Sequence, residues 1–381
     1  MRPTIVIDGH IPFVRGILEP FARVIYSLSG AIDRKLAMQA DGLIIRTRTR
    51  CDAALLEGTP VRFIATATIG HDHIDTVYCG SKGINWHDAP GCNATAVMQY
   101  VASALATLCL RQDYTLINKR IGIIGAGHVG TKTASLANIL GMIPLLNDPP
   151  RERNEGSAGF AGLDEILETA DIITLHVPLN LEGADKTYQL AGESFFNSLK
   201  KSPLLINTAR GPVVGTEAVK NAIRKGRVSG FIADVWENEP ALDLELLAMT
   251  DIATPHIAGY SVEGKASGTA ACVRAASRFF GFGIDNWYPE NLPQPANPLI
   301  QLENGAKSHE HLICEAVLAT YDIMRDDAAL RTNPGAFESL RDHYPPRREF
   351  EAYSVMVDGG ETITFQNFST LHQPPFNSPY F

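Results

Sequence analysis

The chain has 381 residues, which at roughly 150 residues per domain is enough for two or three domains. Hydrophobic residues make up 45% and charged residues 20%, close to the globular average, so a wholly disordered or fibrous chain is excluded. The net charge of −9 argues against sequence-independent binding of nucleic acid, which needs clustered positive charge. A few local arginines can still bind an anionic ligand within an acidic protein.

The start of the chain and its cysteines indicate a cytoplasmic protein. The apolar run before Asp8 is too short for the core of a signal peptide. No stretch approaches the roughly 20 apolar residues that span a bilayer, so we expect no membrane partner. The six cysteines are dispersed with no close CxxC pair, which favours reduced thiols.

In the first ninety residues, short β-branched runs bounded by turn signals predict strands. These runs lie at 4–8, 42–46, 62–66 and 83–87. The next segment, 93–112, is apolar-rich and predicts a helix with Asn93 as its N-cap. A helix of this length could connect two domains.

The segment from His71 to Asp75 carries four polar side chains that invite a metal-binding interpretation. They are His71, Asp72, His73 and Asp75. The run has no pair of histidines at helical i, i+4 spacing and no partner cluster elsewhere. A polar turn after the preceding strand is therefore the favoured interpretation, and we expect no metal.

A second series of strands follows and alternates with helices. The predicted strands lie at 120–125, 143–148, 171–177, 203–209, 228–235 and 251–255. Helical segments intervene, such as 217–226, which ends on a glycine suited to the position after a helix. Near-continuous apolar strands suit a parallel sheet covered on both faces, so this block predicts one doubly wound domain.

After Tyr260 the stretch 261–281 predicts a helix, and then the character of the sequence changes. The four prolines within 285–299 resist helix and central strand alike, so this stretch predicts a linker. Beyond it we predict a helix at 308–324 and alternating strands within 352–359 and 362–368. Residues 286–381 are thus expected to form a small α+β module, whose last residues, 371–381, are expected to be poorly ordered.

Three glycines predict a dinucleotide-binding turn. Gly125, Gly127 and Gly130 form the spacing GxGxxG directly after one predicted strand and before a predicted helix. The first permits a tight turn, the second lets the backbone approach a pyrophosphate and the third allows close packing of helix on strand. The helix N-terminus adds N–H donors. A purely structural glycine turn is the alternative.

Asp148 ends the next strand, where a carboxylate can accept hydrogen bonds from ribose hydroxyls. Its negative charge would repel a 2′-phosphate, so the sequence predicts NAD rather than NADP. Arg151 and Arg153 follow closely and leave NADP open as an alternative. An acidic residue unrelated to any ligand is the other alternative.

Three further motifs follow predicted strands, at the sheet edge where open α/β folds bind ligands. They are INTARG at 206–211, DVWENEP at 234–240 and TPHIAGY at 254–260. Oxidising a 2-hydroxy acid requires a base for the hydroxyl proton, a role suited to His256. Glu239 could fix the tautomer of its ring, and Arg210 could bind the substrate carboxylate or reacting oxygen. Each residue taken alone has a structural alternative: a surface turn, an exposed loop or a core histidine.

With these motifs, GAGHVG and Asp148, the sequence resembles the D-isomer-specific 2-hydroxyacid dehydrogenases. The resemblance to one branch of that family covers essentially the whole chain. It includes segments at 65–75, 89–101, 147–151, 256–270, 321–331 and 344–350, the last two in a tail that other dehydrogenases of the family lack.

The resemblance implies that NAD oxidises 4-phospho-D-erythronate to 2-oxo-3-hydroxy-4-phosphobutanoate, in pyridoxal 5′-phosphate (vitamin B6) biosynthesis. It also implies a homodimer built partly by the C-terminal module. Arg210 and Glu239 are then catalytic, and His256 is the proton donor or acceptor.

The resemblance further implies which positions contact the cofactor and the substrate. Cofactor contacts would come from the glycine motif with His128 and Val129, and from Asp148, Val177, Thr208, Ala209, Arg210, Asp234 and Gly259. Substrate contacts would come from Thr47, Thr68 and Tyr260. Two positions depart from the family pattern: Thr47 replaces an expected serine and keeps the hydroxyl, whereas Val177 replaces a frequent threonine and loses it.

The implied fold class is α/β, with two doubly wound parallel-sheet (Rossmann-like) domains and a small C-terminal α+β dimerisation domain. Residues 1–92 and 256–285 would form a split substrate-binding domain, 93–255 the NAD-binding domain and 286–381 the C-terminal domain. The split domain would bring Arg46, Thr47 and Thr68 to a cleft. We expect Arg46 to neutralise the substrate phosphate, helped by Arg347 or Arg348 of the partner subunit; a solvated basic run is the alternative for the last two.

Two competing functions remain open at the level of sequence. The predicted catalytic residues recognise only the 2-hydroxy acid end, so another substrate such as 3-phosphoglycerate fits the same chemistry. An NAD-sensing scaffold that acts through protein contacts is the alternative from a different class.

Overall fold

The computed structural model describes residues 2–28, 31–112, 114–305, 307–358 and 361–363. The chain divides into two compact units, each described below by itself. The first unit comprises Met1–Asn93 and Tyr260–Pro293, and the second comprises Ala94–Gly259 and Gln294–Phe381. Residues 294–381, called the C-terminal segment below, are therefore grouped with the second unit. From sequence we set residues 286–381 apart as a domain of their own, and 286–293 are instead grouped with the first unit. A separate dimerisation role for this segment stays a prediction.

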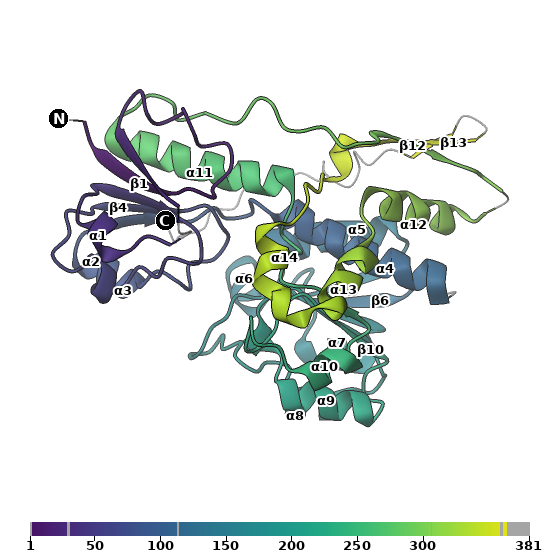
Figure 1. Cartoon of the computed structure of the whole chain (residues 1–381). Coiled ribbons are helices and arrows are strands. Elements are labelled where there is room, and N and C mark those ends of the chain that lie inside the picture. Colours follow the sequence, from purple (N-terminus) through teal and green to yellow (C-terminus); the bar gives the residue numbers. More distant parts are fainter. Residues whose placement is uncertain (1, 29–30, 113, 306, 359–360, 364–381) are drawn as a thin grey trace. The chain divides into compact units, whose positions relative to one another are not determined.

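The first unit is built on a five-stranded sheet in the order β2-β1-β3-β4-β5, with all neighbours parallel (Figure 1). The strands are β1 (Thr4–Asp8), β2 (Arg23–Ser27), β3 (Gly42–Ile45), β4 (Phe63–Thr66) and β5 (Asn85–His87). The helices are α1 (Arg34–Ala37), α2 (Ala53–Leu56), α3 (Thr76–Ser81) and α11 (Val262–Phe280). Alternate strand residues point to opposite faces, so Leu43 and Ile45 belong to one buried cluster and Ile44 to another.

Helix α11 covers one face of this sheet, although about 170 residues separate it from the last strand. Val273 and Ala276 of α11 share a buried cluster with Ile44 and Phe63. Ser261 caps the helix by accepting a hydrogen bond from the Gly264 N–H at 2.8 Å. Gly281 ends it in the left-handed region, where a residue without Cβ is favoured.

The second unit holds a six-stranded sheet in the order β11-β10-β9-β8-β6-β7, also parallel throughout. The strands are β6 (Arg120–Ile124), β7 (Ile143–Asn147), β8 (Ile172–Leu175), β9 (Leu204–Asn207), β10 (Gly230–Ala233) and β11 (Ile252–Ala253). The helices are α4 (Ala94–Gln112), α5 (His128–Ile139), α6 (Pro149–Glu155), α7 (Leu163–Thr169), α8 (Glu193–Ser198), α9 (Thr216–Arg224) and α10 (Leu244–Met249), with the short 3₁₀ helix η1 (Gly211–Val213).

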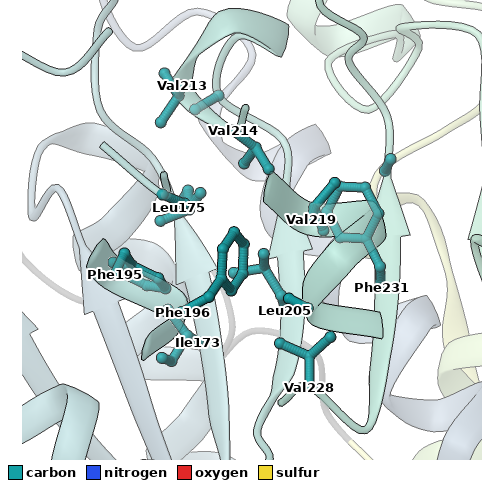
Figure 2. Close-up of a cluster of buried hydrophobic side chains, with 14 of the residues drawn as sticks. Ile173, Leu175, Phe195, Phe196, Leu205, Val213, Val214, Val219, Val228 and Phe231 are labelled. Carbon is teal, nitrogen blue, oxygen red and sulfur yellow. The ribbon is translucent and has the colours of Figure 1, made fainter. Parts of the chain in front are cut away.

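One face of the second sheet packs against α8 and α9 (Figure 2). Phe195 and Phe196 of α8 lie against Ile173 and Leu205 of the sheet, with Val219 of α9 in the same cluster. Each of these side chains is at most 5% exposed. Burial of a side chain of this size contributes about 1.5–3 kcal/mol, so the cluster stabilises the packing of α8 and α9 on the sheet.

Helix α4 is a core helix of the second unit. It packs against α5 and against α12 (His309–Thr320). Its most apolar window, Ala94–Arg111, is long and apolar enough to cross a membrane by composition alone, but 78% of that window is buried inside the structure. Burial of this kind is typical of the core helix of a soluble protein.

The C-terminal segment adds helices and a small mixed sheet to the second unit. The helices are α12 (His309–Thr320), α13 (Ile323–Thr332) and α14 (Phe337–Asp342), with the 3₁₀ turns η2 (Pro334–Ala336) and η3 (Phe350–Ala352). The sheet runs in the order β12 (Leu299–Leu302), β13 (Ser354–Val357) and β14 (Glu361–Ile363). Of the predicted linker 285–299, residues 285–298 contain neither helix nor strand, and its last residue, Leu299, begins β12. The predicted tail at 371–381 lies outside the described residues.

These sheets confirm the predicted α/β class with two parallel, doubly wound sheets. Several elements differ from the prediction, among them β12 and α14, which were not predicted from the sequence. Strand β2 was missed, and the predicted helix at 308–324 is two helices, because α12 ends at Thr320 and Asp322 caps a new helix, α13. The charged stretch 325–331 lies within α13, where Leu330 is fully buried. Asp326 accepts a hydrogen bond from Tyr321, and Asp327 accepts one from Arg331.

Candidate active site

The glycine turn lies between β6 and α5, and its three glycines have different surroundings. Gly125 has φ +93°, and a Cβ there would lie 2.7 Å from the carbonyl oxygen of His176. At Gly130 a Cβ would lie 2.0 Å from the carbonyl oxygen of Gly125, so the helix can pack on the turn only without it. A Cβ at Gly127 would meet nothing within 4 Å. The turn is therefore tight on its inner side and open at Gly127, which fits a phosphate group approaching the N-terminus of the 12-residue helix α5.

This turn lies at the point where the sheet changes direction. From β6 the chain moves to β7 on one side and then to β8 on the other, so β6 and β8 are neighbours with connections leading apart. Ligands of open α/β sheets bind beyond the carboxyl ends of such a pair. Gly125 follows β6, and His176 and Val177 follow β8. His128 and Val129, also expected in the phosphate turn, form the first two residues of α5.

Asp148 follows β7 and is tied to the glycine turn. Its Oδ2 accepts a hydrogen bond from the Ala126 N–H at 2.9 Å, and its Oδ1 caps α6 through the Arg151 N–H at 3.1 Å. Arg151 forms an ion pair with Glu155 at 2.7 Å, and Arg153 pairs with Asp185. Both arginines thus have carboxylate partners, which weakens their case as receptors for a 2′-phosphate. The arrangement fits NAD.

His176 was missed in the sequence, although it follows β8 directly. Its Nδ1 lies 3.1 Å from Thr208 Oγ1, and its Nε2 lies 3.0 Å from Thr174 Oγ1 and 3.4 Å from Thr133 Oγ1. Burial lowers the pKa of His176 to about 3, so the ring is neutral at physiological pH. A neutral ring among three hydroxyls links α5, β8 and the residues after β9. The signal that could have found it is its place at a strand end beside the glycine turn.

The turn after β9 carries Thr208, Ala209 and Arg210. Asn207, which is 1% exposed, accepts a hydrogen bond from the Ala209 N–H at 3.1 Å and donates one to the Arg210 carbonyl at 3.1 Å. Its amide therefore braces the turn on both sides of Ala209. A Cβ at Gly211 would lie 2.0 Å from the backbone of Trp236, so glycine lets this turn approach the next one.

Glu239 and His256 form the central pair of the site. Glu239 Oε1 lies 2.5 Å from His256 Nδ1, and its Oε2 accepts a hydrogen bond from the Trp236 N–H at 3.2 Å. Burial raises the pKa of Glu239, but the hydrogen bond and charge of His256 and the Trp236 N–H outweigh it, so the net pKa lies below its usual value. The carboxylate stays ionised and holds one ring nitrogen, leaving Nε2 as the atom for chemistry.

Asp234 organises the loop that carries His256. Its Oδ1 accepts hydrogen bonds from Thr254 Oγ1 at 2.6 Å and from the Ile257 N–H at 2.8 Å, and its Oδ2 accepts one from the Ala258 N–H at 2.9 Å. The side chain is 1% exposed. His256 has φ +55°, a conformation that costs a residue with Cβ free energy and persists only where neighbours fix it. The bonds of Asp234 supply that fixation, and Gly259 follows in the same loop.

The first unit has its own strand-end edge. Arg46 follows β3 and donates from Nε to Oδ2 of the fully buried Asp8 at 2.7 Å, while His10 Nδ1 lies 3.3 Å from Asp8 Oδ1. Since β1 and β3 are the neighbours at which this sheet changes direction, the pair marks the expected ligand edge. Asp8 and His10 were not predicted from sequence. Arg46 is therefore already partnered by one carboxylate.

The other predicted substrate residues also belong to the first unit. Thr47 is exposed in the turn after β3. Thr68 follows β4, and its Oγ1 lies 2.9 Å from that of Thr66, which in turn lies 3.0 Å from His73 Nε2. Tyr260 begins the return of the chain, with the Lys265 ammonium 4.7 Å from its ring centre. His73 thus belongs to a polar turn, and no group of three metal-binding side chains occurs among the described residues.

Arg347 and Arg348 are not a solvated basic run. They are 6% and 8% exposed, which contradicts that alternative. Arg347 Nη2 donates to the carbonyl of Ala258 at 2.5 Å, within the loop of His256. The Arg348 carbonyl accepts a hydrogen bond from Gln99 at 3.0 Å. Segments far apart in sequence therefore meet inside one unit, which no local pattern could reveal.

Comparison with known proteins places this geometry in a family. Residues 105–258 match the family described as "D-isomer specific 2-hydroxyacid dehydrogenase, NAD binding domain". Residues 291–370 match a family described as "Domain of unknown function (DUF3410)". The cofactor is therefore NAD, as the glycine turn and Asp148 predicted.

Relatives match along almost the entire chain. An erythronate-4-phosphate dehydrogenase of Bacteroides fragilis is 49% identical over 93% of this chain and 99% of the relative. The enzyme of that name from Escherichia coli is 37% identical over 97% of this chain and 99% of its own. The C-terminal segment is thus shared with these relatives.

Solved structures share the fold. D-lactate dehydrogenase of Aquifex aeolicus, complexed with NAD and lactic acid, has a TM-score of 0.62 at 24% identity and covers 76% of this chain and all of its own. NAD-bound 3-phosphoglycerate dehydrogenase of Entamoeba histolytica has a TM-score of 0.60 at 23% identity and covers 77% of this chain and all of its own. The chain belongs to the D-isomer-specific 2-hydroxyacid dehydrogenase family and, within it, to the erythronate-4-phosphate dehydrogenases.

Proposed function

We propose that this protein oxidises erythronate 4-phosphate at its 2-hydroxyl, with NAD, to 2-oxo-3-hydroxy-4-phosphobutanoate in pyridoxal 5′-phosphate biosynthesis. The observation that carries the proposal is the 2.5 Å contact between Glu239 and His256 at the strand-end edge that also holds Arg210 and the glycine turn. The names of the relatives supply the substrate. A site of this composition suits hydride transfer from a 2-hydroxy acid.

His256 is the proposed base. Because Nδ1 is directed at Glu239, Nε2 accepts the hydroxyl proton as the C2–H bond breaks. Glu239 keeps the ring in the required tautomer and stabilises the imidazolium that forms. Bound NAD supplies the hydride acceptor. Arg210 directs a permanent positive charge at the substrate carboxylate or the reacting oxygen and so orients the 2-hydroxy acid.

We assign cofactor contacts to the strand-end turns of the second unit. Gly127, His128 and Val129 present the N-terminus of α5 to the pyrophosphate, and Asp148 accepts hydrogen bonds from the ribose. The remaining proposed contacts come from the backbone and side chains of the turns after β8, β9, β10 and β11. They are Val177, Thr208, Ala209, Arg210, Asp234 and Gly259.

We assign substrate contacts to Arg46, Thr47, Thr68 and Tyr260 of the first unit. Arg46 donates to Asp8 from Nε at 2.7 Å and more weakly from Nη2 at 3.4 Å, and a guanidinium with five N–H donors keeps others for a phosphate. Asp8 then orients the guanidinium, and its negative charge offsets part of the positive charge of Arg46. Arg46→Ala should raise the KM for erythronate 4-phosphate far more than that for unphosphorylated erythronate. An equal loss on both substrates would contradict the phosphate role.

We further propose a cytoplasmic homodimer that uses the C-terminal segment and has no nucleic-acid or membrane partner. All six cysteines lie among the described residues and none is in a disulfide, which suits a reducing compartment. Sedimentation of the purified protein tests the dimer; a monomer at micromolar concentration would contradict it.

A substrate panel tests the activity. Initial rates of NADH formation should be highest with erythronate 4-phosphate and much lower with 3-phosphoglycerate or D-lactate. If another 2-hydroxy acid were oxidised fastest, the proposed reaction would stand but the proposed substrate would be wrong. No turnover with any 2-hydroxy acid, despite NAD binding, would instead support a sensing scaffold.

A further inference from the structure

The side chain of Arg347 is buried beside the catalytic loop, and the proposed chemistry gives it no role. Arg347 comes from the C-terminal segment, between α14 and η3. Its Nη2 donates to the Ala258 carbonyl at 2.5 Å and lies 3.4 Å from that of Ala96 at the start of α4. Its Nε and Nη1 have no hydrogen-bond partner among the described residues. The buried charge of Arg347 therefore makes one short hydrogen bond, and that bond is to the loop that carries His256.

The aromatic and acidic neighbours of Arg347 hold it in this position. Its guanidinium lies 4.3 Å from the ring centre of Tyr321, at cation–π distance. Tyr321 and Tyr344 both donate hydrogen bonds to Asp326 Oδ2, at 2.7 and 2.8 Å. Burial raises the pKa of Asp326, although those hydrogen bonds and the charge of Arg347 act to lower it. The set of Arg347, Tyr321, Tyr344 and Asp326 is built entirely from the C-terminal segment.

The backbone that presents Arg347 is anchored separately. Gln99 of α4 donates to the carbonyl of Arg348 at 3.0 Å and lies 3.3 Å from Thr320 Oγ1. Ser103 of α4 donates to the carbonyl of Tyr321 at 2.7 Å. The backbone around Arg347 is therefore bonded to α4, which holds the guanidinium in place. Through its hydrogen bond to Ala258, Arg347 can restrict the movement of the loop that carries His256.

The loop after β11 is consequently bonded from two directions. Asp234 accepts the N–H groups of Ile257 and Ala258, and Arg347 donates to the carbonyl of Ala258. His256, at the start of the loop, has φ +55° and must be held there. Asp234 bonds only to donor groups of this loop, so the hydrogen bond to the Ala258 carbonyl comes from Arg347.

We propose that Arg347 is a positioning residue, which fixes the 256–259 loop and thereby the ring of His256, so that the C-terminal segment takes part in catalysis within its own chain. The proposal rests on the proposed function, since it assigns His256 as the base. It replaces the expectation that Arg347 binds the substrate phosphate from a partner subunit. A displacement of about 1 Å at a reacting group can cost on the order of 100-fold in rate, so a distant arginine can control kcat.

The test compares four variants of the full-length protein. Arg347→Met removes the charge and the donors, and Arg347→Lys keeps the charge and N–H donors but loses the planar guanidinium. Arg325→Met is the exposed control. The side chain of Arg325 is 87% exposed, and its ion pair with Asp322 is long, at 4.0 Å. Arg331→Met is the structural control, because Arg331 binds Asp327 and the carbonyls of Leu247 and Thr250 without contacting the 256–259 loop.

For Arg347→Met we expect kcat to fall at least about tenfold, with KM for NAD and for substrate changed less than about threefold. Arg347→Lys should lose a few-fold in kcat and so lie between Arg347→Met and wild type. Hydrogen exchange in the peptide 254–260 should quicken in Arg347→Met. Arg325→Met should match wild type, and Arg331→Met should lose stability while its folded fraction keeps kcat.

A kcat of Arg347→Met within about twofold of wild type, or an effect confined to KM, overturns the proposal. If Arg347→Met does not fold, Arg347→Lys decides: a lowered kcat at unchanged KM supports the proposal, and a wild-type kcat overturns it. If wild type shows no turnover, the proposed function fails, and the exchange measurement alone decides whether Arg347 holds the loop.

Discussion

Glu239 and His256 are 17 positions apart in the sequence, and Glu239 Oε1 lies 2.5 Å from His256 Nδ1. One belongs to the loop after β10 and the other to the loop after β11. The two strands are parallel neighbours, so their carboxyl ends bring the loops together. The pair provides a base of fixed tautomer whose second nitrogen is directed away from the carboxylate.

Replacing the carboxylate should separate its chemical role from its structural one. Glu239→Gln keeps the size of the side chain but cannot stabilise the imidazolium, so kcat should fall roughly 10²–10⁴-fold with little change in KM. Steady-state kinetics measure this. Glu237→Gln is the control, because Glu237 accepts a hydrogen bond from the Thr216 N–H and has no hydrogen bond or ion pair with His256 among the described residues. A Glu239→Gln variant with kcat close to that of wild type would show that the pair is merely structural.

The buried carboxylate of Asp234 should contribute to stability. Asp234→Asn places an amide NH₂ or a single oxygen where three donors now converge, so at least one buried donor loses its acceptor. The expected loss is about 1–3 kcal/mol in the free energy of unfolding. Urea denaturation measures it. An unchanged midpoint and slope would mean that the three bonds carry no net free energy.

His176 should make stability depend on pH. Its folded pKa, about 3, lies below the ordinary value of 6.5, so the unfolded chain binds more protons between these values. The stabilising contribution is fully present above pH 6.5 and is lost as the pH falls towards 3, by on the order of 1 kcal/mol per pH unit.

His176→Asn should therefore show a shallower loss of stability between pH 6.5 and 4 than wild type. Chemical denaturation at several pH values gives the two slopes. Identical slopes would mean that the imidazole can be protonated without leaving its place among Thr133, Thr174 and Thr208.

Alanine substitutions at Gly130 and Gly127 should have different effects, the first on stability and the second on NADH binding. Gly130→Ala puts a Cβ 2.0 Å from the Gly125 carbonyl oxygen, so the fold itself must shift, at a cost of roughly 1–3 kcal/mol or more. Gly127→Ala meets nothing within 4 Å, so the thermal midpoint should stay near that of wild type while the Kd for NADH rises. Thermal unfolding and NADH fluorescence titration measure both. Unimpaired NADH binding by Gly127→Ala would argue against phosphate approach at this turn.

Much of the fold could be predicted because its strands are encoded locally. The predicted strand at 4–8 coincides with β1, and the one at 120–125 covers β6 and one further residue. Turn signals bound both. Strand β2 was not recognised in this way, because its apolar run, 24–26, is only three residues long and stands between the polar residues Arg23 and Ser27.

The positions of the candidate site residues were predictable where a motif follows a strand, as at Gly125 and His256. Their contacts were not predictable where distant segments meet. The contact of Arg46 with Asp8 joins residues 38 apart, and that of Arg347 with Ala258 joins residues 89 apart. Such contacts depend on how the elements pack, which no spacing in the sequence reports. His176 lies between these cases, since its position was visible but its three hydroxyl partners were not.

The most direct test of the account is the rate of NADH formation from erythronate 4-phosphate by wild type and by His256→Asn, with NADH affinity measured for both. The account predicts turnover by wild type and a loss of roughly 10²–10⁴-fold in kcat for the variant, at nearly unchanged NADH affinity. A His256→Asn variant that kept the wild-type kcat would contradict the assignment of His256 as the base.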